Sequence, residues 1–136
     1  MERRPFYQIK PSAYLFRSDD QKAKDRLDLE EPVRQWCAFE LIRAYGIQVQ
    51  RLTFEAEARV GSKTYRIDIL IKLKDQPWAV VECKKRSWKK HEDALEQARS
   101  YAVSEKVNAE FVVYTNGDVW LVERRVEGEW GRVSDL

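Results

Sequence analysis

Two largely apolar stretches in the middle of the chain are typical of buried β-strands. They occupy residues 66–71 and 78–84, and both are rich in isoleucine, valine and other apolar residues. Residues 74–77 have a turn-like composition and separate the two stretches. Because apolar residues fall on both faces, we expect an antiparallel pair that is covered on both sides within a larger sheet.

The ionisable residues of this pair are predicted to share one face. If the turn is centred on Asp75, Asp68 lies opposite Glu82 and Arg66 lies opposite Lys84, because side chains alternate between the faces of a strand. The Cβ atoms of such a pair lie ~5 Å apart. Two carboxylates that close are destabilising unless a cation neutralises them, and Mg²⁺ prefers carboxylate oxygens. The pattern therefore predicts a metal site with a lysine beside it, whereas a solvated strand end with ordinary salt bridges is the plainer alternative.

Helical patterns flank the strand pair. Residues 32–45 predict a helix that Gly46 ends, since proline suits the first helical position and glycine the residue just past the last one. Glu31 is then expected at the N-cap, because the residue before a proline is disfavoured in helical geometry. Residues 90–106 predict a second helix with alanines along one side.

Further strands are expected on both sides of the second helix. Residues 49–60 form an extended pattern before a turn at 61–63, and residues 111–114 predict a buried strand. Asn116-Gly117 predicts a tight turn into a last strand at 119–122. The order of helix, three strands, helix and two strands indicates an α/β fold, a sandwich with a mixed central sheet flanked by helices and one parallel crossover.

Composition supports one folded domain. The chain has 136 residues, of which 43% are hydrophobic and 12% aromatic, enough for a core. We assign residues 31–136 to a single domain and residues 1–30 to an N-terminal arm. No apolar run reaches membrane-spanning length and no signal sequence is visible, so we expect a cytoplasmic protein. Cys37 and Cys83 are expected to be buried thiols of a reducing compartment.

Charge is concentrated directly after the second central strand, although the net charge is only +2. The basic residues there are Lys85, Arg86, Lys89 and Lys90. A basic segment beside a metal site suits a polyanionic substrate, whereas taken alone a solvated loop is the favoured interpretation. Trp88 in this segment is expected to pack on the core rather than to stack on a base. His91, the single histidine, is expected at the surface.

These residues resemble a known group of nucleases. Asp68 followed by Glu82-x-Lys84 on the next strand is similar to the motif of the PD-(D/E)xK superfamily, with Ile67 in place of the proline. The chain more closely resembles the N-terminal nuclease domain of type I restriction enzyme R subunits, over roughly residues 30–120. The supporting segments are Glu31-Pro32-Val33-Arg34-Gln35, Tyr45-Gly46, Arg66-Ile67-Asp68-Ile69, Val80-Val81-Glu82-Cys83-Lys84, Gln97-x-x-x-Tyr101 and Tyr114-Thr115-Asn116-Gly117.

The resemblance implies roles for the strand residues. Asp68 and Glu82, helped by the backbone carbonyl of Cys83, would bind Mg²⁺, for which Mn²⁺ can substitute. Lys84 would orient or activate the attacking water. The implied activity is that of a Mg²⁺-dependent DNA endonuclease that hydrolyses phosphodiester bonds.

The resemblance also implies roles for helical residues. Gln97 and Tyr101 would share a helix face and support the site and the DNA backbone. Glu31 matches an acidic residue of the first helix that completes the metal or water shell, and its N-cap position is an equally good explanation. The candidate DNA-binding residues are Lys85, Arg86, Lys89, Lys90, Gln97 and Tyr101.

Two other functions remain open at this level. The chain could be a catalytically idle DNA-binding or assembly module of a restriction or repair complex, or a purely structural protein. A small domain without a visible specificity element must obtain its target from a partner. We expect that partner to be a second copy of the chain or a separately encoded motor, specificity or methyltransferase subunit. The sequence contains no ATP-binding glycine-rich loop, so we expect no ATP-driven translocation by these residues.

Overall fold

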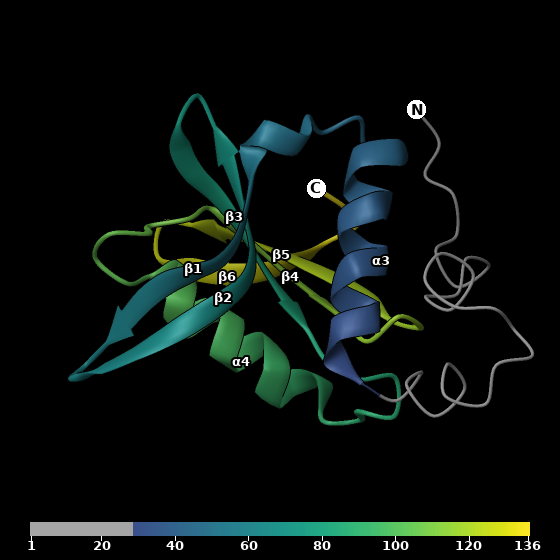
Figure 1. Ribbon diagram of the computed structural model, residues 1–136. Coiled ribbons are helices and arrows are strands. Elements are labelled where there is room, and N and C mark those ends of the chain that lie inside the picture. The colour runs from purple at the N-terminus through teal and green to yellow at the C-terminus, as the bar shows by residue number, and fades with distance from the viewer. Residues whose placement is uncertain (1–28) are drawn as a thin grey trace, which may run out of the picture.

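A six-stranded mixed sheet forms the centre of the structure, with one helix packed against each face (Figure 1). The computed structural model describes residues 29–136, so all but the last two residues of the predicted N-terminal arm lie outside the described range. The elements are α3 (Glu30–Arg43), the 3₁₀ turn η2 (Val49–Arg51), β1 (Leu52–Val60), β2 (Lys63–Leu73), β3 (Gln76–Cys83), α4 (His91–Ala102), β4 (Phe111–Thr115), β5 (Trp120–Val126) and β6 (Glu129–Val133).

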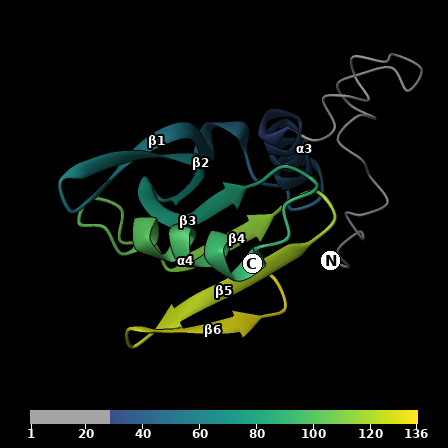
Figure 2. The ribbon, with the colours of Figure 1, turned by 90° about the horizontal axis from the view of Figure 1, so that it is seen from below.

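The strands follow one another across the sheet in chain order, from β1 to β6 (Figure 2). Among the strands of residues 29–136, only β3 and β4 are parallel, and α4 connects them, whereas the other neighbours are antiparallel. A parallel pair needs a long crossover, and a helix supplies it. The predicted α/β class and the mixed sheet are therefore confirmed.

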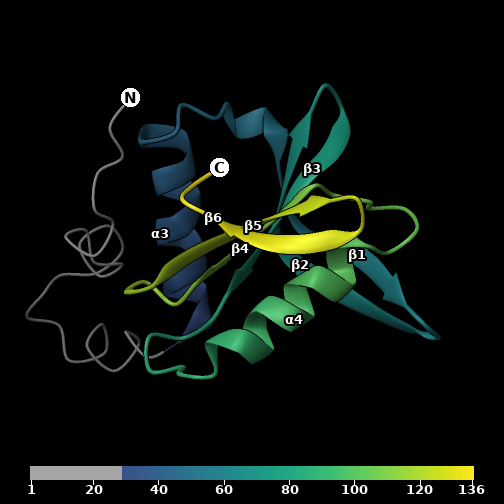
Figure 3. The ribbon, with the colours of Figure 1, turned by 180° about the vertical axis from the view of Figure 1, so that it is seen from behind.

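Each face of the sheet carries its own hydrophobic core. Trp36 and Leu41 of α3 pack against Ile69 and Val81 on one face. Leu95 of α4 packs on the other face, in the core that contains the remaining inward side chains of the central strands. Figure 3 shows the two helices separated by the strands. The central strands are thus buried on both faces, which explains their nearly continuous apolar sequence.

The predicted register of the central hairpin is confirmed over three pairs. Ile69 pairs with Val81, Leu70 with Val80 and Ile71 with Ala79. Beyond Ile71 the register shifts, and the turn contains only two residues, Lys74 and Asp75, with positive φ angles of 51° and 63°. Two successive residues of positive φ are typical of the turn that matches the twist of a hairpin.

The predicted pairing of Arg66 with Lys84 is wrong. The β2–β3 ladder ends at Ile69 and Val81, and Arg66 pairs with Glu57 of β1. The backbone N–H of Lys84 donates to the carbonyl of Thr115 at 3.0 Å. The chain after β3 therefore follows the parallel strand β4 and leaves β2.

The boundaries of both helices differ from the prediction. Helix α3 begins at Glu30 with Leu29 at the N-cap, so the N-cap assignment of Glu31 is wrong. Pro32 lies in the first turn, where backbone amides have no intrahelical acceptor, and helical geometry is tolerated there. Helix α4 ends at Ala102 instead of Lys106, and turns occupy most of the next residues.

The predicted turn at Asn116-Gly117 is confirmed, since it lies in the connection between the antiparallel strands β4 and β5. The connection covers residues 116–119, and the Asn116 Oδ1 atom accepts hydrogen bonds from the N–H groups of Asp118 and Val119, both at 2.9 Å. Strand β6 is absent from the prediction.

The two cysteines are buried free thiols, as predicted, and Cys83 forms a side-chain hydrogen bond with Cys37. Within residues 29–136, no helix is long and apolar enough to cross a membrane.

Candidate active site

Two carboxyl groups meet on the face of the sheet that α4 covers. Asp68 of β2 accepts a hydrogen bond from the backbone N–H of Cys83, with 2.8 Å between N and Oδ2. Glu82 of β3 is only 5% exposed and forms a side-chain hydrogen bond with Asp68. The predicted approach of these two residues is therefore confirmed, although regular pairing of the strands ends one residue earlier.

The environment of Glu82 favours its neutral form. Burial is the largest cause, followed by the hydrogen bond and the charge of Asp68, and together they raise the pKa of Glu82 to about 10. The charge of Lys84 acts in the opposite direction but does not outweigh them. At neutral pH this carboxyl group keeps its proton unless a cation offsets the charge of the pair.

Lys84 lies beside the carboxyl pair at the end of β3. Its Nζ atom is 3.9 Å from Oε1 of Glu30 and 4.8 Å from the centroid of the Trp88 ring. The Lys84 side chain is only 14% exposed. In Figure 1 the first turn of α3, which contains Glu30, lies beside the connection from β3 to α4.

Gln97 and Tyr101 of α4 lie at the same site. The Gln97 Nε2 atom donates to the Tyr101 hydroxyl at 2.7 Å. Burial, followed by the negative charge of Glu82, raises the pKa of Tyr101 to about 12, while the hydrogen bond from Gln97 opposes the shift. Tyr65 of β2 packs against Tyr101 with 5.5 Å between ring centroids. Tyr101 thus lies close to Glu82, and Gln97 is joined to it by a hydrogen bond on the same face of α4.

An open groove of about 520 Å³ runs along α4 beside Lys84. The residues lining it are Lys84, Trp88, Lys90, Asp93, Glu96, Gln97 and Ser100. Among the candidate DNA-binding residues, Lys90 and Gln97 line this groove, whereas Lys85 and Lys89 are exposed but do not line it. Arg86 is paired with Asp118 at 3.0 Å, and Tyr101 is buried.

Glu31 and its neighbour Glu30 contact different partners. Glu31 forms an ion pair with Arg34 at 2.6 Å and accepts a hydrogen bond from Gln35 at 3.0 Å. Burial tends to raise the pKa of Glu31, but these two contacts outweigh it and lower the pKa. Glu30 is the acidic residue of α3 that approaches Lys84, and its charge also acts on Glu82. Sequence reasoning missed Glu30 because the helix begins earlier than predicted.

Nothing in the sequence indicated what Asn116 and His91 contact. The Asn116 Nδ2 atom donates to the carbonyls of Trp88 at 2.9 Å and Arg86 at 3.3 Å. It thereby ties the β3–α4 connection to the loop after β4. His91 is half-buried, and its Nδ1 atom lies 2.7 Å from the hydroxyl of Tyr114, so its predicted surface position is only partly right.

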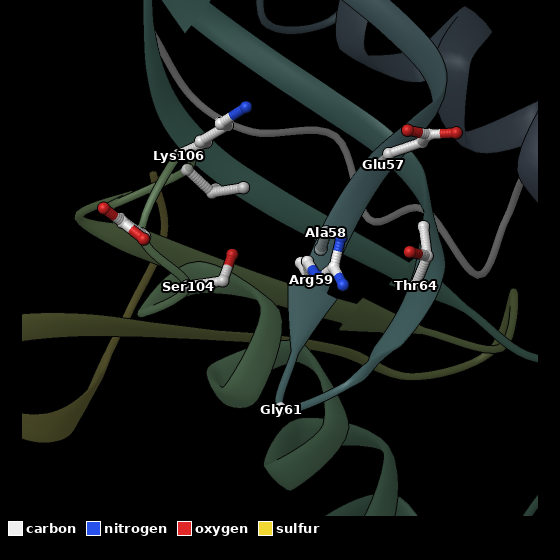
Figure 4. A pocket seen from close by; sticks show the side chains of 9 residues that line it. Glu57, Ala58, Arg59, Gly61, Thr64, Ser104 and Lys106 are labelled. Carbon is white, nitrogen blue, oxygen red and sulfur yellow. The ribbon is translucent and has the colours of Figure 1, made fainter.

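A second hollow, of about 480 Å³, lies at the other end of α4, near the β1–β2 turn (Figure 4). Its charged lining residues are Glu57, Arg59, Glu105 and Lys106. Neither Asp68 nor Glu82 lines this hollow, so it is separate from the candidate site. Its two acidic and two basic side chains give it no net charge that would favour a polyanion.

The donor atoms at the carboxyl pair suit a hard divalent cation. In residues 29–136, no group of three or more His, Cys, Asp and Glu side chains is arranged to hold a metal ion. Mg²⁺, however, is commonly bound by one or two carboxylates and completes its shell with water. Asp68 and Glu82 supply two carboxyl groups that repel each other when both are ionised, so the pair fits this ion.

A family model matches most of the chain. The family model of the type I restriction enzyme R protein N terminus matches residues 29–131, which is more than half of the chain. The matched range includes Asp68, Glu82, Lys84, Gln97 and Tyr101. No curated protein and no solved structure matches the chain.

Proposed function

Because the chain belongs to the family of the type I restriction enzyme R protein N terminus, we propose that it is a Mg²⁺-dependent DNA endonuclease. The observation that carries the proposal is the pair of half-buried Asp68 and buried Glu82, with the ammonium of Lys84 beside it. A pKa raised by burial and a like charge is typical of functional sites. The proposal places the chain in the PD-(D/E)xK superfamily.

The metal ion would be held by Asp68, Glu82 and the backbone carbonyl of Cys83, and Mn²⁺ could replace Mg²⁺. When bound, such an ion supplies a water of lowered pKa and offsets negative charge on the phosphate. Glu82 must release its proton for the site to bind the ion. The hydrogen bond from the Cys83 N–H keeps Asp68 oriented toward Glu82 without using the thiol.

Lys84 has two tasks in this proposal. Its ammonium orients the attacking water, and it stabilises the negative charge that grows on the phosphate oxygens in the transition state. The water oxygen adds to phosphorus, one ester P–O bond breaks, and the leaving oxygen takes up a proton. The products are a phosphomonoester and an alcohol, so the reaction consumes only water.

The substrate backbone would follow the groove beside α4. Lys90 and Gln97 line it and can contact phosphate oxygens, while Lys85 and Lys89 add exposed positive charge nearby. Arg86 contributes once it leaves Asp118, and Tyr101 supports Gln97. Glu31 would join the water shell only after leaving Arg34, so Glu30 is better placed for that role.

A catalytically idle DNA-binding or assembly module is the second candidate. It is favoured by one observation, namely that within residues 29–136 no third carboxylate completes an all-protein metal site. Titration with Mn²⁺, with and without a DNA duplex, separates the candidates. A nuclease binds Mn²⁺ in the wild type and loses it in Glu82→Gln, whereas an idle module binds DNA equally in Mn²⁺ and in EDTA.

A further inference from the structure

The ring of Trp88 is a direct neighbour of Lys84. The Lys84 Nζ atom lies 4.8 Å from the ring centroid, within the range in which the face of an indole attracts a cation. The same ammonium is 3.9 Å from Glu30, and its charge acts on Glu82. Lys84 thus has three neighbours from three segments, namely Trp88 of the β3–α4 connection, Glu30 of α3 and Glu82 of β3.

Trp88 is fixed by contacts of both its ring and its backbone. Its indole Nε1–H donates to the carbonyl of Lys90 at 2.9 Å, and its backbone N–H donates to the carbonyl of Lys85 at 3.0 Å. Its own carbonyl accepts the hydrogen bond from Asn116. The ring is half-buried and packs against the core beneath α4. A rotation of the indole to stack on a nucleobase would break the hydrogen bond to Lys90 and remove the ring from its packing on the core.

A lysine needs such a support more than most residues do. Its ammonium stands on a flexible four-carbon stem and can choose among nearby acceptors. Glu30 alone would draw the ammonium toward α3. A ring face attracts the charge without accepting all of its N–H donors, so the donors remain available for water and phosphate oxygens.

We propose that Trp88 is a positioning residue, whose indole face holds the Lys84 ammonium between the carboxyl pair and the groove. This role rests on the proposed nuclease function, because it acts through Lys84. Asn116 supports the ring indirectly, because it holds the backbone of the segment that carries Trp88. It accepts from two N–H groups of its own loop and donates to the carbonyls on either side of Ser87, which fixes the segment that carries the ring.

Two substitutions separate the aromatic face from mere bulk. Trp88→Leu keeps an apolar side chain but removes the ring, whereas Trp88→Phe keeps a ring face and removes the indole N–H. We expect the first to lower the single-turnover cleavage rate roughly 5- to 30-fold at unchanged DNA affinity, and the second to stay within about 3-fold of wild type. Trp130→Leu is the matched control. Trp130 lies on β6, its ring contacts Arg125 of β5, and it does not line the groove.

The kinetic result decides the role in cleavage. Equal losses in both Trp88 variants, an unchanged rate in Trp88→Leu, or a loss of DNA affinity alone would overturn the proposal. Circular dichroism of each variant confirms that the fold is retained.

A second measurement does not depend on cleavage. The ring current of Trp88 should shift the ε-methylene protons of Lys84 upfield in a ¹H–¹³C NMR spectrum, and Lys84→Ala identifies the signal. The upfield shift should persist in Trp88→Phe and disappear in Trp88→Leu, and its absence in the wild type would contradict the contact. A wild type that cuts no DNA with either metal contradicts the nuclease function and with it the role in cleavage, while the spectrum still decides whether the contact exists.

Discussion

The backbone N–H of Cys83 donates to the carboxylate of Asp68 at 2.8 Å, so the strand that carries Glu82 also orients the carboxylate of the strand beside it. The two acidic groups are therefore fixed relative to each other by one backbone contact. Glu82 is left buried with a like-charged neighbour, and the cost appears in its raised pKa. A cation is the natural counterpart of such a pair.

Metal binding should release a proton from Glu82. Since burial and Asp68 raise its pKa to about 10, the group is protonated at pH 7 and must ionise to become a ligand. We expect Mn²⁺ affinity to rise with pH between about 6 and 8. Calorimetric titrations in buffers of different ionisation enthalpy should show about one proton released per ion.

The control for this prediction is Glu82→Gln, which has no proton to release and should bind the ion far more weakly. Tight binding without any proton release in the wild type would mean that Glu82 is already ionised or is not a ligand.

Glu82 should also make the metal-free protein less stable as the pH rises. Its pKa is 4.5 in the unfolded chain and higher in the folded state, so between these values the folded state binds more protons. The free energy of unfolding then falls with increasing pH, by at most about 1.4 kcal/mol per pH unit. Urea unfolding in EDTA should show this as a change in the stability difference between Glu82→Gln and the wild type. Between pH 6 and pH 8, that difference should shift in favour of the variant by about 1–3 kcal/mol.

The contrast between the two pH values is the critical point of that experiment. If the difference between the variant and the wild type were the same at pH 6 and pH 8, the folded state would not hold the extra proton. Added Mn²⁺ should raise the stability of the wild type alone, because the ion binds only the folded protein.

Arg99 fastens α4 to the sheet. Its guanidinium donates to both carboxylate oxygens of Glu123 on β5, at 2.6 and 2.8 Å, and also to Glu92 at 2.7 Å. These contacts, led by the hydrogen bond from Arg99, lower the pKa of Glu123. Glu123 is 5% exposed, so Arg99→Ala leaves a nearly buried carboxylate short of its main partner. We expect a loss of about 2–3 kcal/mol in urea unfolding at pH 7.

The matched control is Arg124→Ala, because Arg124 lies next to Glu123 on β5. Arg124 pairs with Glu110 at the same distance of 2.6 Å, but both side chains are at least 40% exposed. Exposed pairs contribute at most about 1 kcal/mol, so this variant should unfold at nearly the wild-type urea concentration. Similar losses in both variants would contradict the argument from burial.

Much of the site follows from local pattern. The side-chain period of two predicted that Asp68 and Glu82 share a face and that Leu70 pairs with Val80. The turn is centred between Lys74 and Asp75 and not on Asp75, and the register shift after Ile71 compensates for this difference. The central strands were easy to predict because they are apolar on both faces. Strand β6, at the sheet edge, carries only Trp130 and Val133 as large apolar residues and has no comparable signal.

The remaining errors concern information that is not local. Leu29 has no side chain that can cap a helix, so nothing in the sequence marked the start of α3, and Glu30 was overlooked. Asn116-Gly117 forms the predicted turn between β4 and β5, but its composition does not indicate that Asn116 also bonds to residues about thirty positions earlier. The contact of Glu30 with Lys84 and those of Asn116 with Arg86 and Trp88 join residues far apart in the sequence, so no local pattern predicts them.

A plasmid-nicking assay tests the central claim most directly. Purified protein is incubated with supercoiled DNA and Mg²⁺ or Mn²⁺, beside Asp68→Asn, Glu82→Gln and Lys84→Ala. Lys63→Ala is the matched control for the lysine, because Lys63 is exposed at the start of β2. We predict nicking by the wild type and by Lys63→Ala, and a loss of about 10²-fold or more in EDTA and in the three site variants. Cutting that persists in EDTA or survives Lys84→Ala would contradict the account.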